Sequence, residues 1–169
     1  MLAHRPVRES DLPQIVEFVQ SARELFDIYP AATYPFTVDQ LKQTIVAGFE
    51  STVILQDNDI VGFANFYALK AGDWCGIGNL IVCPDKRNQG VGTYLVRTMI
   101  NIAMTKHKVK TISISCFADN FASLMLYTKL GFKPEAIDSM PAPDGNGIPR
   151  INFKLESGIN IPDTCNSPQ

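Results

Sequence analysis

The sequence has few of the residues that build metal sites or disulfide frameworks. Four cysteines and two histidines occur among its 169 residues, and no two cysteines have CxxC spacing. We therefore expect neither a bound metal ion nor a disulfide framework. The chain also lacks an apolar run long enough to cross a bilayer, and its first residues do not resemble a signal peptide. The resulting prediction is a cytoplasmic protein with no membrane partner.

An excess of charge of either sign is missing as well. Fifteen basic residues stand against seventeen acidic ones, which leaves a net charge of -2. Proteins that bind nucleic-acid phosphates usually carry a basic excess, so no nucleic-acid partner is expected. Hydrophobic residues make up 46% of the chain, enough for the core of one domain. We place this domain at residues 1–156 and expect a loosely ordered polar tail at residues 157–169.

Helical and strand patterns alternate along the chain. Apolar spacing and capping residues predict helices near residues 10–22, 37–48, 90–106 and 120–130. Alternating or β-branched runs predict strands near residues 6–8, 51–56, 60–69, 76–83, 111–117, 132–138 and 150–155. Residues 23–36 contain two prolines and are expected to be irregular, and residues 139–147 are expected to form a long turn-rich loop. This order predicts an α/β fold.

A glycine-containing segment links the strand near residues 76–83 to the following helix. It reads Arg87-Asn88-Gln89-Gly90-Val91-Gly92. Two glycines at the start of a helix let backbone N–H groups approach an anion without an intervening Cβ. These first N–H groups have no partner inside the helix, and the helix dipole makes this end positive. A phosphate or pyrophosphate is the predicted ligand, with Arg87 as an additional donor.

The helix after Asn120 carries a second group of polar residues. Asn120, Ser123 and Tyr127 are spaced i, i+3 and i+7 and therefore share one stripe. The neighbouring stripe has core spacing and consists of Phe121, Leu124, Met125 and Thr128. Because loops at the carboxyl ends of neighbouring parallel strands converge on one ligand, this helix and the glycine segment are expected to line the same cleft.

With these residues the sequence resembles the GNAT superfamily of N-acetyltransferases, which use acetyl-CoA. The family signature is a strand, Arg/Gln-x-x-Gly-x-Gly/Ala and a helix, followed about thirty residues later by Asn and, seven residues on, by Tyr before Gly-Phe. The matching positions are Arg87, Gly90, Gly92, Asn120, Tyr127, Gly131 and Phe132. The resemblance implies a GNAT-like central mixed sheet of about seven strands, flanked by about four helices, with two splayed parallel central strands.

The resemblance also implies roles for individual residues. The backbone of Leu80, Ile81 and Val82 should bind the pantetheine arm of acetyl-CoA. Arg87 and the backbone N–H groups of Asn88, Gln89, Gly90, Val91, Gly92 and Thr93 should hold the pyrophosphate. Asn120 should bind near the pantetheine, with Ser123 beside it, and Tyr127 should protonate the departing thiolate. The co-substrate would be a primary amine, either of a small molecule or of a peptide.

The general base is not assigned by this resemblance. Many family members carry Glu at the start of the strand where this chain has Gly76. Asp73 lies nearby in sequence and is one candidate, and a water relay is the other. The acceptor should contact residues 23–36 and 139–149, where Glu24 and Asp27 could meet a cationic amine.

Two further interpretations come from other classes of protein. A dinucleotide-binding enzyme is disfavoured because the third glycine of that fingerprint is missing, and a P-loop is excluded because Gly-Lys-Ser/Thr is absent. A non-catalytic domain that binds acyl-CoA stays open, because Gly76 removes the familiar base. The oligomeric state also stays open between a monomer and a homodimer.

Overall fold

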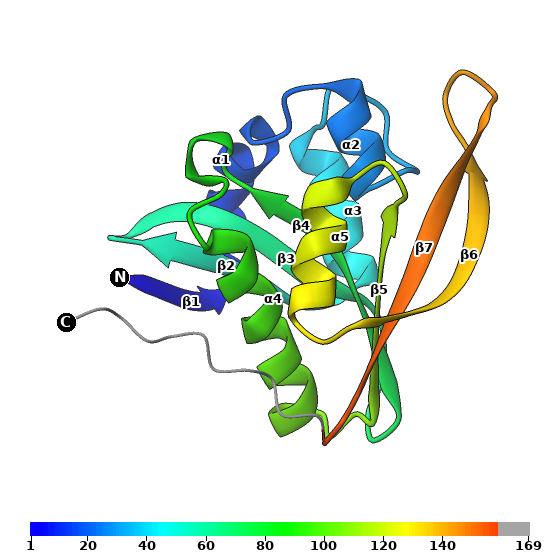
Figure 1. Cartoon of the computed structure of the whole chain (residues 1–169). Coiled ribbons are helices and arrows are strands. Elements are labelled where there is room, and N and C mark those ends of the chain that lie inside the picture. The colour runs from blue at the N-terminus through cyan, green and yellow to red at the C-terminus, as the bar shows by residue number, and fades with distance from the viewer. Residues whose placement is uncertain (159–169) are drawn as a thin grey trace.

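The computed structural model describes residues 1–158 as three layers, with a mixed sheet between two groups of helices (Figure 1). The seven strands lie in the order β1-β2-β3-β4-β5-β7-β6. Their bounds are β1 Leu2–Pro6, β2 Phe49–Gln56, β3 Asp59–Lys70, β4 Trp74–Val82, β5 Thr111–Phe117, β6 Lys133–Pro141 and β7 Gly147–Glu156. The α-helices are α1 Leu12–Glu17, α2 Ala22–Ile28, α3 Val38–Ala47, α4 Val91–Asn101 and α5 Phe121–Lys129. The predicted α/β fold is confirmed.

Local turn chemistry explains the register of the first strands. Asp57 and Asn58 join β2 to β3 with φ of 50° and 76°, the left-handed conformation that a two-residue hairpin turn requires. Asp and Asn tolerate this conformation better than most residues. The turn sets Gln56 opposite Asp59 and Ile54 opposite Gly62.

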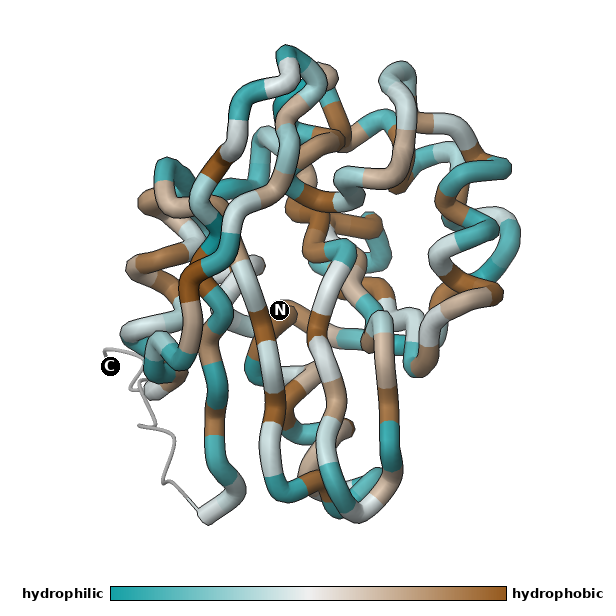
Figure 2. Tube along the Cα trace, turned by 90° about the vertical axis from the view of Figure 1, so that its right-hand side faces the viewer, coloured by the Kyte–Doolittle hydropathy of each residue, from teal (hydrophilic) through white to brown (hydrophobic). Residues whose placement is uncertain are grey.

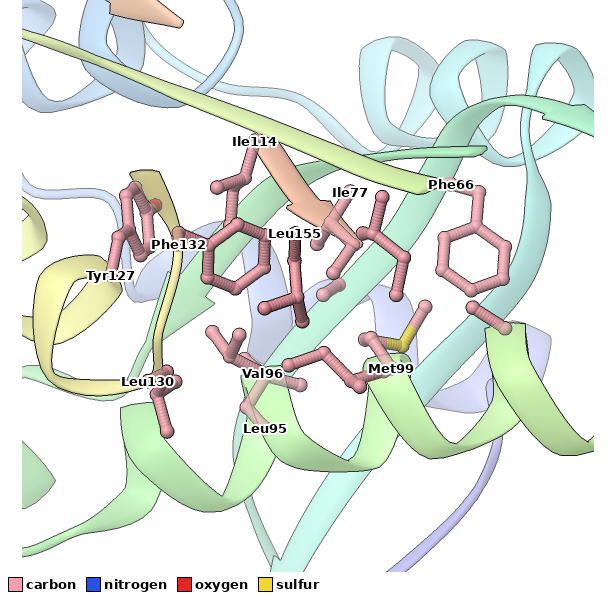
Figure 3. Packing of buried hydrophobic residues seen from close by; sticks show 14 of the residues in the cluster. Phe66, Ile77, Leu95, Val96, Met99, Ile114, Tyr127, Leu130, Phe132 and Leu155 are labelled. Carbon is pink, nitrogen blue, oxygen red and sulfur yellow. The ribbon is translucent and has the colours of Figure 1, made fainter. Parts of the chain in front are cut away.

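Each face of the sheet is covered by its own hydrophobic cluster. Leu95 and Met99 of α4 and Tyr127 of α5 pack against one face (Figure 3). The other face carries a cluster from the N-terminal helices, with Ile15 of α1 and Leu41 of α3. Hydrophobic and hydrophilic residues are interleaved along the strands (Figure 2), which lets the sheet bury apolar side chains while polar ones reach its edges and cavities.

The sheet opens at its only parallel pair of strands in the described chain. β4 and β5 are paired through three residues each, 74–76 with 111–113. Beyond Gly76 the two strands separate, although β4 continues to Val82 and β5 to Phe117. The backbone N–H and C=O groups of β4 and β5 that face this gap therefore do not pair with each other. The predicted splaying of two parallel central strands is confirmed.

The structure corrects several predicted boundaries. β1 begins four residues earlier than residue 6, the first helix ends at Glu17, and a fifth α-helix, α2, occupies part of the segment expected to be irregular. A capping signal explains α2, because the Ser21 hydroxyl accepts from the backbone N–H of Glu24. The hairpin formed by β6 and β7 shortens the predicted long loop to residues 142–146, since its strands extend to Pro141 and from Gly147.

Two helices also differ from expectation. The predicted helix that ends near residue 106 changes its form in its last turn, and α5 buries a different side. Residues 102–106 form a π-helical turn, η3, after α4. On α5 the buried side is that of Tyr127, whereas Phe121 and Met125 are 71% and 74% exposed. The tyrosine ring packs against Phe132 and Phe153, which turns the adjacent stripe outward.

No helix in residues 1–158 is both long enough and apolar enough to cross a membrane. The predicted tail at residues 157–169 lies almost entirely outside the described residues.

Candidate active site

The start of α4 is an open helix terminus. The side chains of Ser21, Thr37 and Asn120 accept hydrogen bonds from the first turns of α2, α3 and α5. At α4 the N-cap is Gly90, which has no side chain to do this and adopts φ +85°. Because the first N–H groups of a helix have no internal acceptor, this end of α4 can bind an anion.

Arg87 lies just before this helix terminus. Its guanidinium donates to Glu24 of α2 at 2.8 Å and to the Val82 carbonyl at 3.3 Å. Arg87 is about two-fifths exposed, so an incoming phosphate can reach it. A bound phosphate would have to share Arg87 with Glu24 or displace that carboxylate.

The predicted stripe on α5 faces the opening between β4 and β5. Asn120 Oδ1 accepts from the backbone N–H of Ser123 at 3.2 Å, so its amide nitrogen is left to donate to a ligand. Tyr127 is 4% exposed, and its ring is held by Phe132 and Phe153. Ser123, one turn earlier on α5, is the hydrogen-bond partner of its hydroxyl. Burial raises the pKa of Tyr127 above its ordinary value, so the phenol stays protonated at neutral pH.

A bulge in β4 shapes the other side of the opening. Phe63 and Asn65 of β3 face Ile81 and Gly78, so β4 carries one residue more than β3 here. Asn79 accommodates the bulge with φ +52°, a conformation that Asn adopts more readily than most residues. Its side-chain amide donates to Oδ1 of the fully buried Asn65 at 2.8 Å.

Two cavities meet at this opening. The small cavity, of about 500 Å³, lies over the N-terminal part of the gap and is bordered by Tyr67, Asn79, Cys116 and Arg150. The large cavity, of about 830 Å³, runs along the start of α4 and is bordered by Arg87. The linings of the two cavities have six residues in common, namely Asp27, Ile28, Leu80, Asn120, Ser123 and Tyr127.

Most of the predicted ligand-binding residues lie around the large cavity. Its lining includes Leu80, Ile81, Val82, Arg87, Asn88, Gly90, Gly92, Thr93, Asn120, Ser123 and Tyr127. Two predicted residues do not line it. The Val91 side chain is buried in the core, and the Gln89 amide donates to the Asp85 carbonyl at 2.8 Å. Only the backbone of these two residues can contribute to an anion site.

Asp73 is not brought to either cavity. It lies in the turn between β3 and β4, at the end of the sheet away from α2 and the start of α5 (Figure 1). Lys70 pairs with its carboxylate at 2.8 Å and lowers the pKa of Asp73. A lowered pKa and a remote position both argue against the predicted role of Asp73 as a base.

Tyr67 at the opening was not singled out from the sequence, whereas Asp27 was expected to meet the acceptor amine. Tyr67 of β3 lies across Gly76 and Gly78, where a Cβ at Gly76 would overlap its ring. Asp27 lies on α2, which the sequence analysis had taken as irregular. The spacing of Ser21 and Glu24, a capping-box pattern, could have predicted this helix and the position of Asp27 on it.

Comparison with known proteins gives a consistent result. Residues 16–132 match the acetyltransferase (GNAT) family. L-amino acid N-acetyltransferase AaaT of Escherichia coli (strain K12) is 29% identical over 90 residues, which cover 52% of this chain and 56% of the relative. The match therefore spans about half the length of that relative.

Solved structures share the fold over most of the chain. Ribosomal-protein-S18-alanine N-acetyltransferase from Escherichia coli has a TM-score of 0.72 at 23% identity, over 92% of this chain and 94% of that one. The structure of yncA from Salmonella typhimurium with its cofactor acetyl-CoA has a TM-score of 0.71 at 18% identity, over 98% and 99%. At these identities the likeness establishes a common fold.

Proposed function

Because the chain belongs to the acetyltransferase (GNAT) family, we propose that it transfers an acetyl group from acetyl-CoA to a primary amine. The observation that carries this proposal is the meeting of two cavities beside Tyr127 and Asn120. A two-substrate reaction needs two such sites with a shared boundary. The acceptor is an amine of a small molecule or of a peptide, in keeping with relatives named for L-amino acids and for a ribosomal-protein alanine.

The large cavity suits acetyl-CoA. The uncapped start of α4 offers N–H donors to the pyrophosphate, and Arg87 adds a charged donor. The free edge of β4 at Leu80–Val82 offers backbone groups to an extended pantetheine arm. When bound, acetyl-CoA supplies an activated acetyl thioester.

Tyr127 is the general acid in this proposal. Tyr127 lines both cavities, and Ser123 beside it is the hydrogen-bond partner of its hydroxyl. A thiolate that leaves from the boundary between the cavities would meet this donor first. Burial keeps the phenol protonated, so it can donate to the sulfur as negative charge grows there.

Substitutions at Gly90 test the cofactor site. Gly90→Asp should weaken CoA binding at least ten-fold, because its carboxylate can accept from the same N–H groups that would hold the pyrophosphate. Gly90→Ala imposes the same unfavourable φ of +85° without the charge, so it serves as the matched control and should bind CoA more tightly than Gly90→Asp. Arg87→Ala should weaken binding by about one decade. Isothermal titration with CoA measures all three, and equal affinity in Gly90→Asp and the wild type would contradict the site.

A second measurement separates an enzyme from a binding domain. Acetyl-CoA and a panel of small amines and short peptides are mixed with the protein, and release of the CoA thiol is followed. An acyltransferase releases thiol in an amine-dependent manner. A protein that binds CoA in the titration but releases no thiol with any amine would be the non-catalytic alternative.

A further inference from the structure

Asp27 is the carboxylate that lies where the two cavities meet. It belongs to α2, and its side chain is 24% exposed. Among the described residues, no other aspartate or glutamate lines the small cavity. Because Asp27 also borders the large cavity, it faces the space in which an amine and a thioester would react.

Arg23 holds Asp27 in place, and a second carboxylate, that of Asp119, holds Arg23. Arg23 donates through Nε to Asp27 at 3.0 Å and through Nη2 to both oxygens of Asp119 at 2.8 and 2.9 Å. These contacts join α2 to the loop between β5 and α5, which lie side by side in Figure 1. Two carboxylates thus share one guanidinium, which leaves one uncompensated negative charge. Asp27 Oδ2 makes no hydrogen bond to another described residue and is left for a ligand.

Position 76, Asp73 and Tyr67 do not supply the base. A carboxylate at position 76 would collide with the Tyr67 ring, and Asp73 lies at the other end of the sheet. Tyr67 itself is a poor base near neutral pH, because burial raises the pKa of its phenol and the group therefore stays protonated.

The surroundings of Asp27 favour a basic, cation-binding carboxylate. Burial raises the pKa of Asp27, Arg23 opposes this rise, and the charges of Asp119 and Glu24 add to it. Cys116 faces it from β5, and burial together with Asp27 raises the pKa of that thiol to about 11. The thiol is therefore neutral at pH 7, and a carboxylate of raised pKa accepts a proton more readily than an exposed one.

We propose that Asp27 binds the ammonium form of the acceptor and removes its proton, so that the acceptors are aliphatic primary amines that are cationic at neutral pH. This assignment rests on the acetyl transfer proposed above. An alkyl ammonium has a pKa of about 10.4, so only about one part in two thousand is neutral at pH 7. A buried carboxylate that pairs with the cation and takes its proton increases the reactive fraction within the site.

The protons and bonds balance in this scheme. The ammonium gives one proton to Asp27, which passes it to water. The free nitrogen then forms a bond to the acetyl carbon and the carbon–sulfur bond breaks. Tyr127 protonates the sulfur, and the second proton lost by the nitrogen replaces the one that Tyr127 gave. The products are the amide, the CoA thiol and one proton released to water.

Asp27→Asn tests the assignment with an isosteric change. At pH 7 its kcat/KM for an alkyl amine should fall by about 100-fold or more, the scale of general base catalysis. The loss should shrink to a few-fold near pH 10, where the free amine is abundant. An aryl amine, which is neutral at pH 7, should lose much less than the alkyl amine. Asp27→Glu keeps the charge and should retain more activity than Asp27→Asn.

Control variants make the result decisive. Asp39→Asn, at an exposed aspartate of α3 that lines neither cavity, should match the wild type, and so should Asp73→Asn. Affinity for CoA and the melting temperature show whether Asp27→Asn is folded. Full alkyl-amine activity in Asp27→Asn, or an equal loss with aryl and alkyl amines at every pH, would overturn the role of Asp27. A wild type that acetylates no amine would instead overturn the proposed function.

Discussion

Removing the hydroxyl of Tyr127 isolates the proposed acid from the packing of its ring. In Tyr127→Phe the contacts with Phe132 and Phe153 remain, and only the hydrogen bond between the hydroxyl and Ser123 is lost. The free energy of unfolding should therefore fall by about 0.5–1.5 kcal/mol, the net worth of one hydrogen bond. Affinity for CoA should stay within a few-fold, because the pyrophosphate site at α4 is untouched.

The chemical step should respond much more strongly. A hydrogen bond to a developing thiolate is worth roughly 1.5–3 kcal/mol, and about 2.7 kcal/mol corresponds to about 100-fold in rate. We therefore expect kcat to fall by about 100-fold. Single-turnover acetyl transfer at saturating amine measures this step without interference from product release.

The control for this experiment is another tyrosine hydroxyl. Tyr94→Phe removes a hydroxyl on α4 that meets His4 at 3.4 Å and lines neither cavity, so its turnover should equal that of the wild type. Because burial raises the pKa of Tyr127, its ionisation should produce no fall in rate below about pH 10. Single-turnover rates of Tyr127→Phe that equal those of the wild type would refute the assignment and leave water as the acid.

Two further predictions concern the stability of the scaffold. Asn65→Leu should lower the free energy of unfolding by about 2–4 kcal/mol, because the Thr44 carbonyl and the Asn79 amide both lose a buried partner; urea titration measures it, and a loss below 1 kcal/mol would contradict this accounting. Asp11 accepts from Arg5 at 2.6 and 2.9 Å, which lowers its pKa, so its stabilisation is present above about pH 4 and is lost as the pH falls through the lower folded-state pKa. Asp11→Asn should thus cost about 1–3 kcal/mol at pH 7 and less at pH 3, and an equal cost at both values would exclude an ionic role.

Local signals in the sequence were sufficient wherever the structure is decided by neighbouring residues. The turn at Asp57 and Asn58, the cap at Thr37 and the glycine at the start of α4 each depend on a few residues only, and the helices near residues 37–48 and 90–106 begin where they were predicted. The same holds for the buried stripe of α4, since a helix repeats its faces every 3.6 residues. On α5 the stripe of Asn120, Ser123 and Tyr127 lines the cavities as predicted, but Phe121 and Met125 of the neighbouring stripe are exposed because the Tyr127 ring occupies the core-facing side.

The sequence by itself thus determined the family, the sheet with its parallel pair and the two segments that flank the proposed cofactor site. Only the tertiary structure decided which groups surround the reaction space. Asp27, Tyr67 and Tyr127 come from elements far apart in the chain, and they meet because β4 and β5 separate after three paired residues. Asp73 is close to Gly76 in sequence, yet a strand rises by about 3.3 Å per residue, so three positions along β4 carry it away from the cavities. Closeness to Gly76 in sequence therefore does not place Asp73 at the cavities. Distance along the strand and packing across the sheet decide which side chains meet there.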